Sequence, residues 1–150
     1  MADAIPQPSV SAIRLFACMA RFEFALKESG YVAGDEGKRV SPDWAKFEAD
    51  AMRSNVLQRL RASDVATLLL DSPPRRQIRS GDGFVWGDPL QIRNARQLCA
   101  AVRQVRNNLF HGGKSGADPR DDELCEGAVG ALLALLEVEP RVRHAFLGEY

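Results

Sequence analysis

The sequence has few cysteines and histidines, the residues that build disulfide frameworks and many metal sites. There are three cysteines and two histidines among 150 residues. The cysteines, Cys18, Cys99 and Cys125, lie far apart within apolar helical stretches. No cluster of His, Cys or carboxylate residues shows the spacing of metal ligands. We therefore expect buried, reduced thiols in a cytoplasmic protein that binds no metal ion or other cofactor.

The sequence also has no excess of charge of either sign and no long hydrophobic run. Its 20 basic and 20 acidic residues cancel, so no overall field attracts nucleic acid. The longest uncharged run, residues 127–136, has ten residues, whereas a membrane-spanning helix needs about 20. Residues 1–10 carry neither the basic leader nor the apolar core of a signal peptide. We expect a soluble protein.

What the sequence does have is length enough for one self-sufficient core and a strong bias towards arginine. The 150 residues predict a single domain over residues 1–150, with no internal repeat or low-complexity segment. Sixteen of the 20 cations are arginines. Guanidinium groups favour bidentate contacts with phosphates or ion pairs with carboxylates, and the composition does not distinguish the two.

Apolar spacing and capping signals predict an all-α fold, a bundle of four main helices with short additional ones. Serine or acidic residues followed by proline mark three helix starts, at 41–43, 118–119 and 139–140. The predicted helices run from Ser9 or Ser11 to Glu28, from Ser41 to about Arg61, and over residues 65–70, 92–111, 119–138 and 140–147. Trp44 is expected in the core.

Residues 75–89 are the one long segment without helical spacing. Two strand-like stretches, Gln77–Arg79 and Phe84–Trp86, flank Gly81-Asp82-Gly83, which predicts a small hairpin. The glycines do not have the spacing of a phosphate-binding loop. Residues 31–40, which also contain glycines, are expected to form a loop.

The segment Ala100–Lys114 presents polar side chains at the end of an amphipathic helix. Arg106 keeps its charge at all ordinary pH values, whereas His111 titrates near neutrality. A proton carrier beside a forked cation is suited to cleaving a phosphodiester, because one group moves protons and the other holds the phosphate. Gly112 and Gly113 are expected to end the helix. The alternative is that His111 complements the helix dipole and Arg106 is a solvated cation.

The run Arg106-Asn107-x-x-x-His111 resembles the R-x4-6-H motif of the HEPN superfamily, in which a polar residue commonly follows the arginine. The segment RFEFALKESG, which contains Glu23, resembles a first-helix segment whose acidic residue faces the motif arginine. The resemblance covers most of the chain as a four-to-five-helix bundle, but only these two segments residue by residue. Antitoxin-modified members carry a tyrosine where this sequence has Gly113, so modification there is not expected.

The resemblance implies a metal-independent endoribonuclease that acts as a homodimer, often in a toxin–antitoxin or phage-defence setting with an antitoxin or other regulatory protein. In that interpretation Arg106, Asn107 and His111 form the catalytic set, and Glu23 holds Arg106. The alternative for Glu23 is an exposed pair with Lys27. The alternative function is a non-catalytic helical bundle that binds RNA, a nucleotide or a protein partner.

Two further expectations concern geometry and the path of an RNA. Five residues at about 100° each place Arg106 and His111 roughly 140° apart on an ideal helix, so either the helix end distorts or two protomers share one cleft. A basic surface, formed with Arg93 and Arg96, would track the RNA backbone, and the alternative is an ion-paired, solvated loop. The candidate RNA-binding residues are Arg103, Lys114, Arg75, Arg76 and Arg79.

Overall fold

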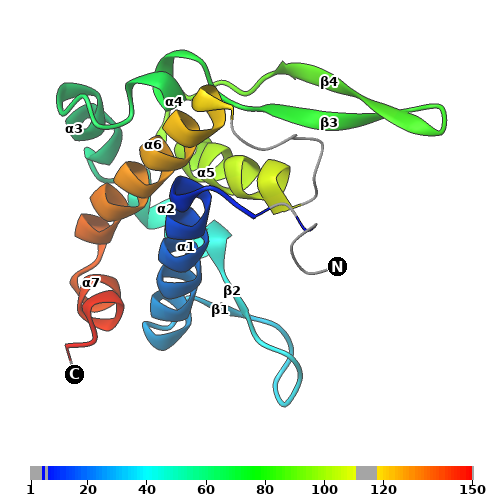
Figure 1. The fold of residues 1–150 in the computed structure, drawn as a ribbon. Helices are drawn as coiled ribbons and strands as arrows, with labels where there is room; N and C mark the ends of the chain where they lie inside the picture. The colour runs from blue at the N-terminus through cyan, green and yellow to red at the C-terminus, as the bar shows by residue number, and fades with distance from the viewer. Residues whose placement is uncertain (1–4, 6, 111–117, 150) are drawn as a thin grey trace.

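The computed structural model describes residues 5, 7–110 and 118–149. These residues form a mainly helical body with two small antiparallel sheets (Figure 1). In chain order the elements are α1 (Val10–Glu28), β1 (Val32–Ala33), β2 (Ser41–Pro42), α2 (Trp44–Ala51), α3 (Val56–Ala62), α4 (Thr67–Asp71), β3 (Arg75–Ser80), β4 (Gly83–Pro89), α5 (Ala95–Phe110), α6 (Pro119–Leu135), a 3-10 turn η2 (Leu136–Val138) and α7 (Pro140–Leu147). The all-α expectation therefore holds for the body and is not exact for the whole chain.

Helix α1 lies against α6 and α7 and buries one side in the common core (Figure 1). Its start follows the capping rule, because Ser9 Oγ accepts a hydrogen bond from the backbone N–H of Ala12 at 3.1 Å. The buried side carries Leu15, Met19 and Phe22, which are almost fully inaccessible to solvent. Glu23, next to the buried Phe22 on α1, is only partly buried.

Helix α5 packs against α6 and is strongly amphipathic, with its apolar side in the core. The predicted start of α6 is confirmed: Asp118 is the N-cap, and Pro119 occupies the first turn. Helix α4 approaches α6 so closely that a Cβ added at Gly127 would lie 3.1 Å from the Cβ of Leu69. The small residue at this position therefore sets the distance between the two helices. The predicted turn that joins α5 to α6 lies outside the described residues.

The start of the second helix differs from the prediction. Asp43, not Ser41, is the N-cap of α2, and its Oδ1 accepts from the backbone N–H of Lys46 at 3.0 Å. Ser41 and Pro42 instead form β2, which pairs with Val32–Ala33 across the segment expected to be a loop. Aspartate and serine are equally good N-caps, so the sequence alone does not choose between Ser41 and Asp43. The pairing of Ser41 and Pro42 with Ala33 and Val32, which lie eight to ten residues earlier in the chain, decides for Asp43.

The second and third predicted helices are also divided differently. The single helix expected to run to about Arg61 is interrupted between α2 and α3, where the Ser54 hydroxyl donates to the Ala51 carbonyl at 2.6 Å and accepts from the Val56 N–H at 3.3 Å. These local bonds replace helical backbone bonds, a known effect of serine. Helix α4 begins at Thr67 rather than residue 65, and Asp64 has a positive φ of 60°.

The predicted hairpin at residues 75–89 is confirmed, with longer strands than expected. Gln77 lies opposite Trp86, and Arg79 lies opposite Phe84. The chain turns at residues 81–82, where Gly81 has a φ of 59° that favours glycine. The hairpin projects from the helical body (Figure 1).

The three cysteines are free thiols. Burial raises the pKa of Cys99 and of Cys125 to about 12, and it also raises the pKa of the partly buried Cys18. The expectation of buried thiols is thus confirmed for Cys99 and Cys125, with Cys18 only partly covered. Among the described helices, none combines the length and apolar character needed to cross a membrane.

Candidate active site

Arg106 is held on two sides near the end of α5. Its Nη1 donates to Glu23 Oε1 on α1 at 3.0 Å, and its Nε and Nη2 both lie 3.3 Å from Asn107 Oδ1. The side chain of Arg106 is still 30% exposed. A guanidinium that is fixed by neighbours and open to solvent is positioned to meet an anionic ligand without first losing much rotamer freedom.

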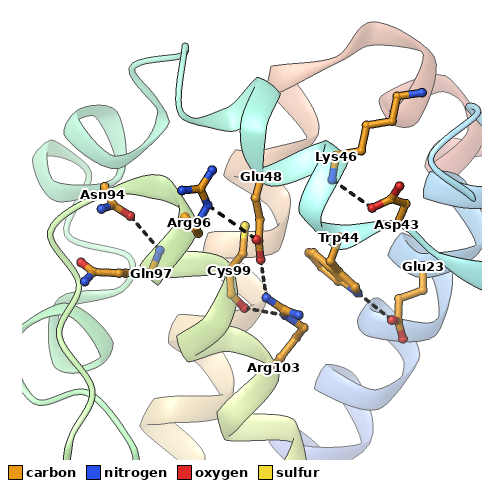
Figure 2. A network of polar contacts seen from close by, with 10 residues as sticks. All are labelled: Glu23, Asp43, Trp44, Lys46, Glu48, Asn94, Arg96, Gln97, Cys99 and Arg103. Carbon is orange, nitrogen blue, oxygen red and sulfur yellow. Dashed lines mark hydrogen bonds and ion pairs between the residues drawn. The ribbon is translucent and has the colours of Figure 1, made fainter. Parts of the chain in front are cut away.

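The carboxylate of Glu23 is itself held by a tryptophan. Trp44 Nε1 donates to Glu23 Oε2 at 2.8 Å (Figure 2). Arg106 donates to Oε1, so each Glu23 oxygen has a separate partner. The indole is buried and stacks on Phe22, with ring centroids 5.5 Å apart. The expectation that Trp44 lies in the core is confirmed, but its polar N–H contributes a contact that the sequence did not predict.

A second arginine, Arg103, lies over the ring of the same indole. Its guanidinium carbon is 5.0 Å from the centre of the Trp44 ring, its Nε donates to the Cys99 carbonyl at 3.3 Å, and its Nη2 donates to Glu48 Oε1 (Figure 2). Glu48 is only 6% exposed, and Arg96 Nε lies 4.0 Å from its other oxygen. The charge of Arg103 is therefore compensated within the protein, which favours a structural role over a direct phosphate contact.

These contacts form one continuous network between three helices. It runs from Glu48 on α2 through Arg103 on α5 to the ring of Trp44, and from the Trp44 N–H through Glu23 on α1 back to Arg106 on α5. Arg103 and Arg106 are three residues apart and so lie on neighbouring parts of one helix surface. The position of Arg106 thus depends, through Glu23, on the buried Trp44.

Arg106 lies at the edge of a cleft of about 600 Å³ between α1 and α5. Phe16 and Phe110 form part of its apolar wall, with ring centroids 6.4 Å apart in an edge-to-face arrangement, and Phe110 is 75% exposed. The described residues that line the cleft are Phe16, Met19, Ala20, Glu23, Arg106, Asn107 and Phe110. Flat apolar walls with one fixed cation suit a ligand that combines an aromatic ring with an anionic group.

The structure brings together three of the predicted catalytic residues, Glu23, Arg106 and Asn107, in the lining of this cleft. Two further predicted site residues, His111 and Lys114, lie outside the described residues. Helix α5 is described up to Phe110, the residue directly before His111. The amide oxygen of Asn107 faces the Arg106 guanidinium, so Asn107 contributes to holding Arg106.

The three arginines of the hairpin are exposed and lie on a separate element from the cleft lining. Arg75 Nη1 donates to the Gly87 carbonyl at 3.2 Å, and Arg79 Nε donates to the Gly81 carbonyl at 3.2 Å. These partners are backbone carbonyls rather than carboxylates, so the bonds leave both positive charges without a neutralising anion in this part of the hairpin. Arg76 lies between them in sequence.

Sequence reasoning did not single out Asn108, which joins the hairpin to the motif helix. Its Nδ2 donates to the Arg75 carbonyl at 2.9 Å, and its Oδ1 accepts from Gln104 Nε2 at 2.8 Å. Asn108 is buried although it is polar. The sequence signal that could have identified it is its position three residues after Val105, on the apolar side of α5. A polar residue at such a position needs hydrogen-bond partners inside the protein.

Comparisons with protein-family models, with curated proteins and with solved structures gave no match to this chain. Within residues 7–110 and 118–149, no group of three or more His, Cys, Asp or Glu side chains is arranged to hold a metal ion.

Proposed function

We propose that the protein is a metal-independent endoribonuclease of the HEPN type. The observation that carries the proposal is the fixed but accessible Arg106, which pairs with Glu23 at 3.0 Å at the edge of an apolar cleft. The resemblance of the Arg106 to His111 run to the HEPN motif supplies the chemical class. Arg106 would hold the phosphate, and the aromatic walls would accommodate an adjoining base.

The reaction uses the nucleophile of its own substrate. His111 removes the proton of the ribose 2′-hydroxyl or donates one to the leaving 5′-oxygen, a contribution of about 10² to 10⁴ in rate. The 2′-oxygen forms a bond to phosphorus while the bond from phosphorus to the 5′-oxygen breaks. Arg106 stabilises the charge that develops on the phosphate, and Asn107 and Glu23 keep its guanidinium in place. The products are a 2′,3′-cyclic phosphate and a 5′-hydroxyl, and DNA is resistant because it has no 2′-hydroxyl.

The active form in this proposal is a homodimer. Arg106 and His111 diverge by roughly 140° on an ideal helix, so the proposal places an Arg106 and a His111 from different protomers in one cleft. Mixing inactive Arg106→Ala protein with inactive His111→Ala protein is then expected to restore part of the activity, because one composite site keeps both groups. Light scattering that shows only a 16.5 kDa monomer while cleavage is intact would contradict the dimer.

The biological setting follows from the resemblance alone. We infer a cytoplasmic toxin–antitoxin or phage-defence role, in which an antitoxin or other regulatory protein restrains the ribonuclease. Co-expression with the products of neighbouring genes would test this: a true antitoxin suppresses growth arrest caused by the wild-type chain. Growth arrest that is equally strong with His111→Ala would show that toxicity does not come from cleavage.

The deciding experiment is cleavage of structured RNA by purified protein in the presence of EDTA. Wild type is expected to cut, and Arg106→Ala and His111→Ala are expected to lose activity. Arg106→Lys keeps the charge but not the forked geometry, so it should also be impaired. Arg143→Ala is the matched control, because Arg143 is a surface arginine on α7 whose partner is Glu137.

Loss of cleavage in EDTA would contradict the metal-independent mechanism. Equal cleavage by wild type and Arg106→Ala would remove Arg106 from it. If wild type binds RNA or a nucleotide but never cuts, the second candidate function, a non-catalytic binding bundle, takes the place of the first, and the observation that favours it is the apolar lining of the cleft.

A further inference from the structure

The hairpin of β3 and β4 carries large aromatic side chains on a projecting arm, which is an unusual place for them. Phe84 is 48% exposed and Trp86 is 37% exposed. The arm extends away from the helical body (Figure 1), so these rings contribute little to the common core. Exposed aromatic side chains that lie together commonly mark a binding surface.

The register of the hairpin places the aromatic rings and a cation on one face. Residues directly opposite in an antiparallel pair share a face, and successive residues alternate between faces. Arg79 lies opposite Phe84, and Gln77 lies opposite Trp86, so these four side chains share a face, here called the aromatic face. Ile78 and its partner Val85 lie on the other side.

The two rings on the aromatic face do not stack face to face on each other. Phe84 and Trp86 meet edge to face, with centroids 5.7 Å apart and planes 87° apart. In this arrangement the planes of the two rings differ, so each can offer a flat surface to a different base. Every nucleobase has a flat π-surface, so stacking on such rings is strong and tolerant of sequence.

The charge of the hairpin complements a nucleic acid backbone. Residues 75–89 contain three arginines and two aspartates, and Arg79 lies on the aromatic face itself. Its one hydrogen bond among these residues goes to the Gly81 carbonyl, which leaves its charge available for a phosphate. Aromatic rings with interleaved guanidinium groups are typical of surfaces that bind unpaired nucleotides.

The arm is fixed to the helix that carries the proposed active site. Asn108 donates to the Arg75 carbonyl at 2.9 Å, and Asn108 follows Arg106 by two residues on α5. A strand of RNA that lies on the arm is therefore bound to an element whose base is attached to α5. This connection is what links the aromatic face to the proposed cleavage site.

We propose that the aromatic face binds single-stranded RNA, with unpaired bases stacked on Phe84 and Trp86 and a phosphate paired with Arg79. The inference rests on the proposed ribonuclease function and names its substrate class as unpaired RNA. Duplex RNA is a poor ligand for this surface, because its bases are already stacked on each other inside the helix.

The test is binding of the full chain to a fluorescent single-stranded oligonucleotide with 2′-O-methyl groups, which lacks the nucleophile and cannot be cut. Phe84→Ala and Trp86→Ala are each expected to weaken binding about 5- to 150-fold, the range for loss of one stacked base. Phe84→Tyr keeps a ring and should retain affinity. Val85→Ala is the matched control, an equally exposed residue on the opposite face, and binding should be unchanged.

A duplex of the same sequence should bind more weakly to wild type, with no further loss in Phe84→Ala. The proposal is overturned if Phe84→Ala and Trp86→Ala bind the single strand as tightly as wild type, or if they lose duplex binding to the same extent. It is also overturned if the wild type is a dimer, the two variants are monomers and RNA binding is unchanged, because the face would then be a contact between protein chains.

Cleavage of unmodified RNA separates this inference from the proposed function. If the wild-type chain never cuts but the aromatic variants lose binding, the aromatic face is supported and the ribonuclease proposal fails. If the wild-type chain cuts and Arg106→Ala does not, while the aromatic variants bind normally, the ribonuclease proposal stands and the aromatic face is rejected.

Discussion

Trp44 Nε1 donates a hydrogen bond of 2.8 Å to Glu23 Oε2, on the side of the carboxylate away from Arg106. A core residue of α2 thus fixes a carboxylate of α1, and that carboxylate fixes an arginine of α5. The arrangement transmits the rigidity of the core to a side chain that is open to solvent, as supporting groups behind an active site do.

Replacing Trp44 with Phe removes the N–H donor and keeps a ring against Phe22 and Arg103. We expect kcat for RNA cleavage to fall by about tenfold, the lower end for loss of a group that orients a functional residue, with KM nearly unchanged. In an Arg106→Ala background the same change should have no further effect, because the arginine that Trp44 helps to position is gone. Steady-state kinetics of the four proteins would check this, and an additive loss would contradict it.

The buried pair of Glu48 and Arg103 is expected to respond unequally to loss of either partner. Arg103→Met leaves a carboxylate that is only 6% exposed, so it should cost about 3–5 kcal/mol. Glu48→Gln leaves an arginine whose side chain is 30% exposed and can become hydrated, so it should cost less. A Glu48→Leu, Arg103→Met double variant should recover much of the loss. Urea unfolding measures all three, and equal, additive losses would contradict the asymmetry.

Asn108→Ala removes the donor that connects α5 to the base of the hairpin. The Arg75 carbonyl and the Gln104 amide each lose a partner, so we expect a loss of about 1–3 kcal/mol. Amide hydrogen exchange should accelerate in β3 and β4, while the amides of α6 serve as an internal control. Uniform acceleration across all elements would show that Asn108 supports the whole fold rather than the arm.

The bond between Tyr31 and Asp50 is expected to make stability depend on acid. Tyr31 Oη donates to Asp50 Oδ2 at 2.6 Å, and this bond, aided by Arg53, lowers the pKa of Asp50 from its ordinary value, while burial and the same contact raise the pKa of Tyr31. A depressed pKa contributes stability above the unfolded-state pKa, and that stability is lost as the pH falls through the folded-state value.

Tyr31→Phe should therefore lower the melting temperature more at about pH 7 than at an acidic pH, because the stability that comes from the lowered pKa of Asp50 is lost as the pH falls through the folded-state value. Thermal unfolding followed by circular dichroism over this pH range provides the measurement. An equal difference at both pH values would show that the hydroxyl contributes without regard to the charge of Asp50. Arg53→Ala is a useful comparison, because it removes the second and more exposed partner of the same carboxylate.

Local features of the fold were accessible from the sequence. Ser9, Asp118 and Glu139 cap helices as predicted, and Gln77–Arg79 pairs with Phe84–Trp86 as predicted. Each of these depends on residues within about ten positions of one another, where cap chemistry and turn geometry act directly. The helix that carries Arg106 belongs to the same class, because the apolar spacing along α5 predicts it.

The tertiary structure decided which distant groups meet. Glu23 and Arg106 are 83 residues apart in sequence, and Glu48 and Arg103 are 55 apart. Arg103 and Arg106 lie three residues apart on α5, and the sequence does not distinguish their surroundings. Arg106 nevertheless lines the cleft, whereas Arg103 is neutralised by the buried carboxylate of Glu48. That difference depends on how α1 and α2 pack against α5, and packing is set by the shapes of many side chains at once rather than by the spacing of any few.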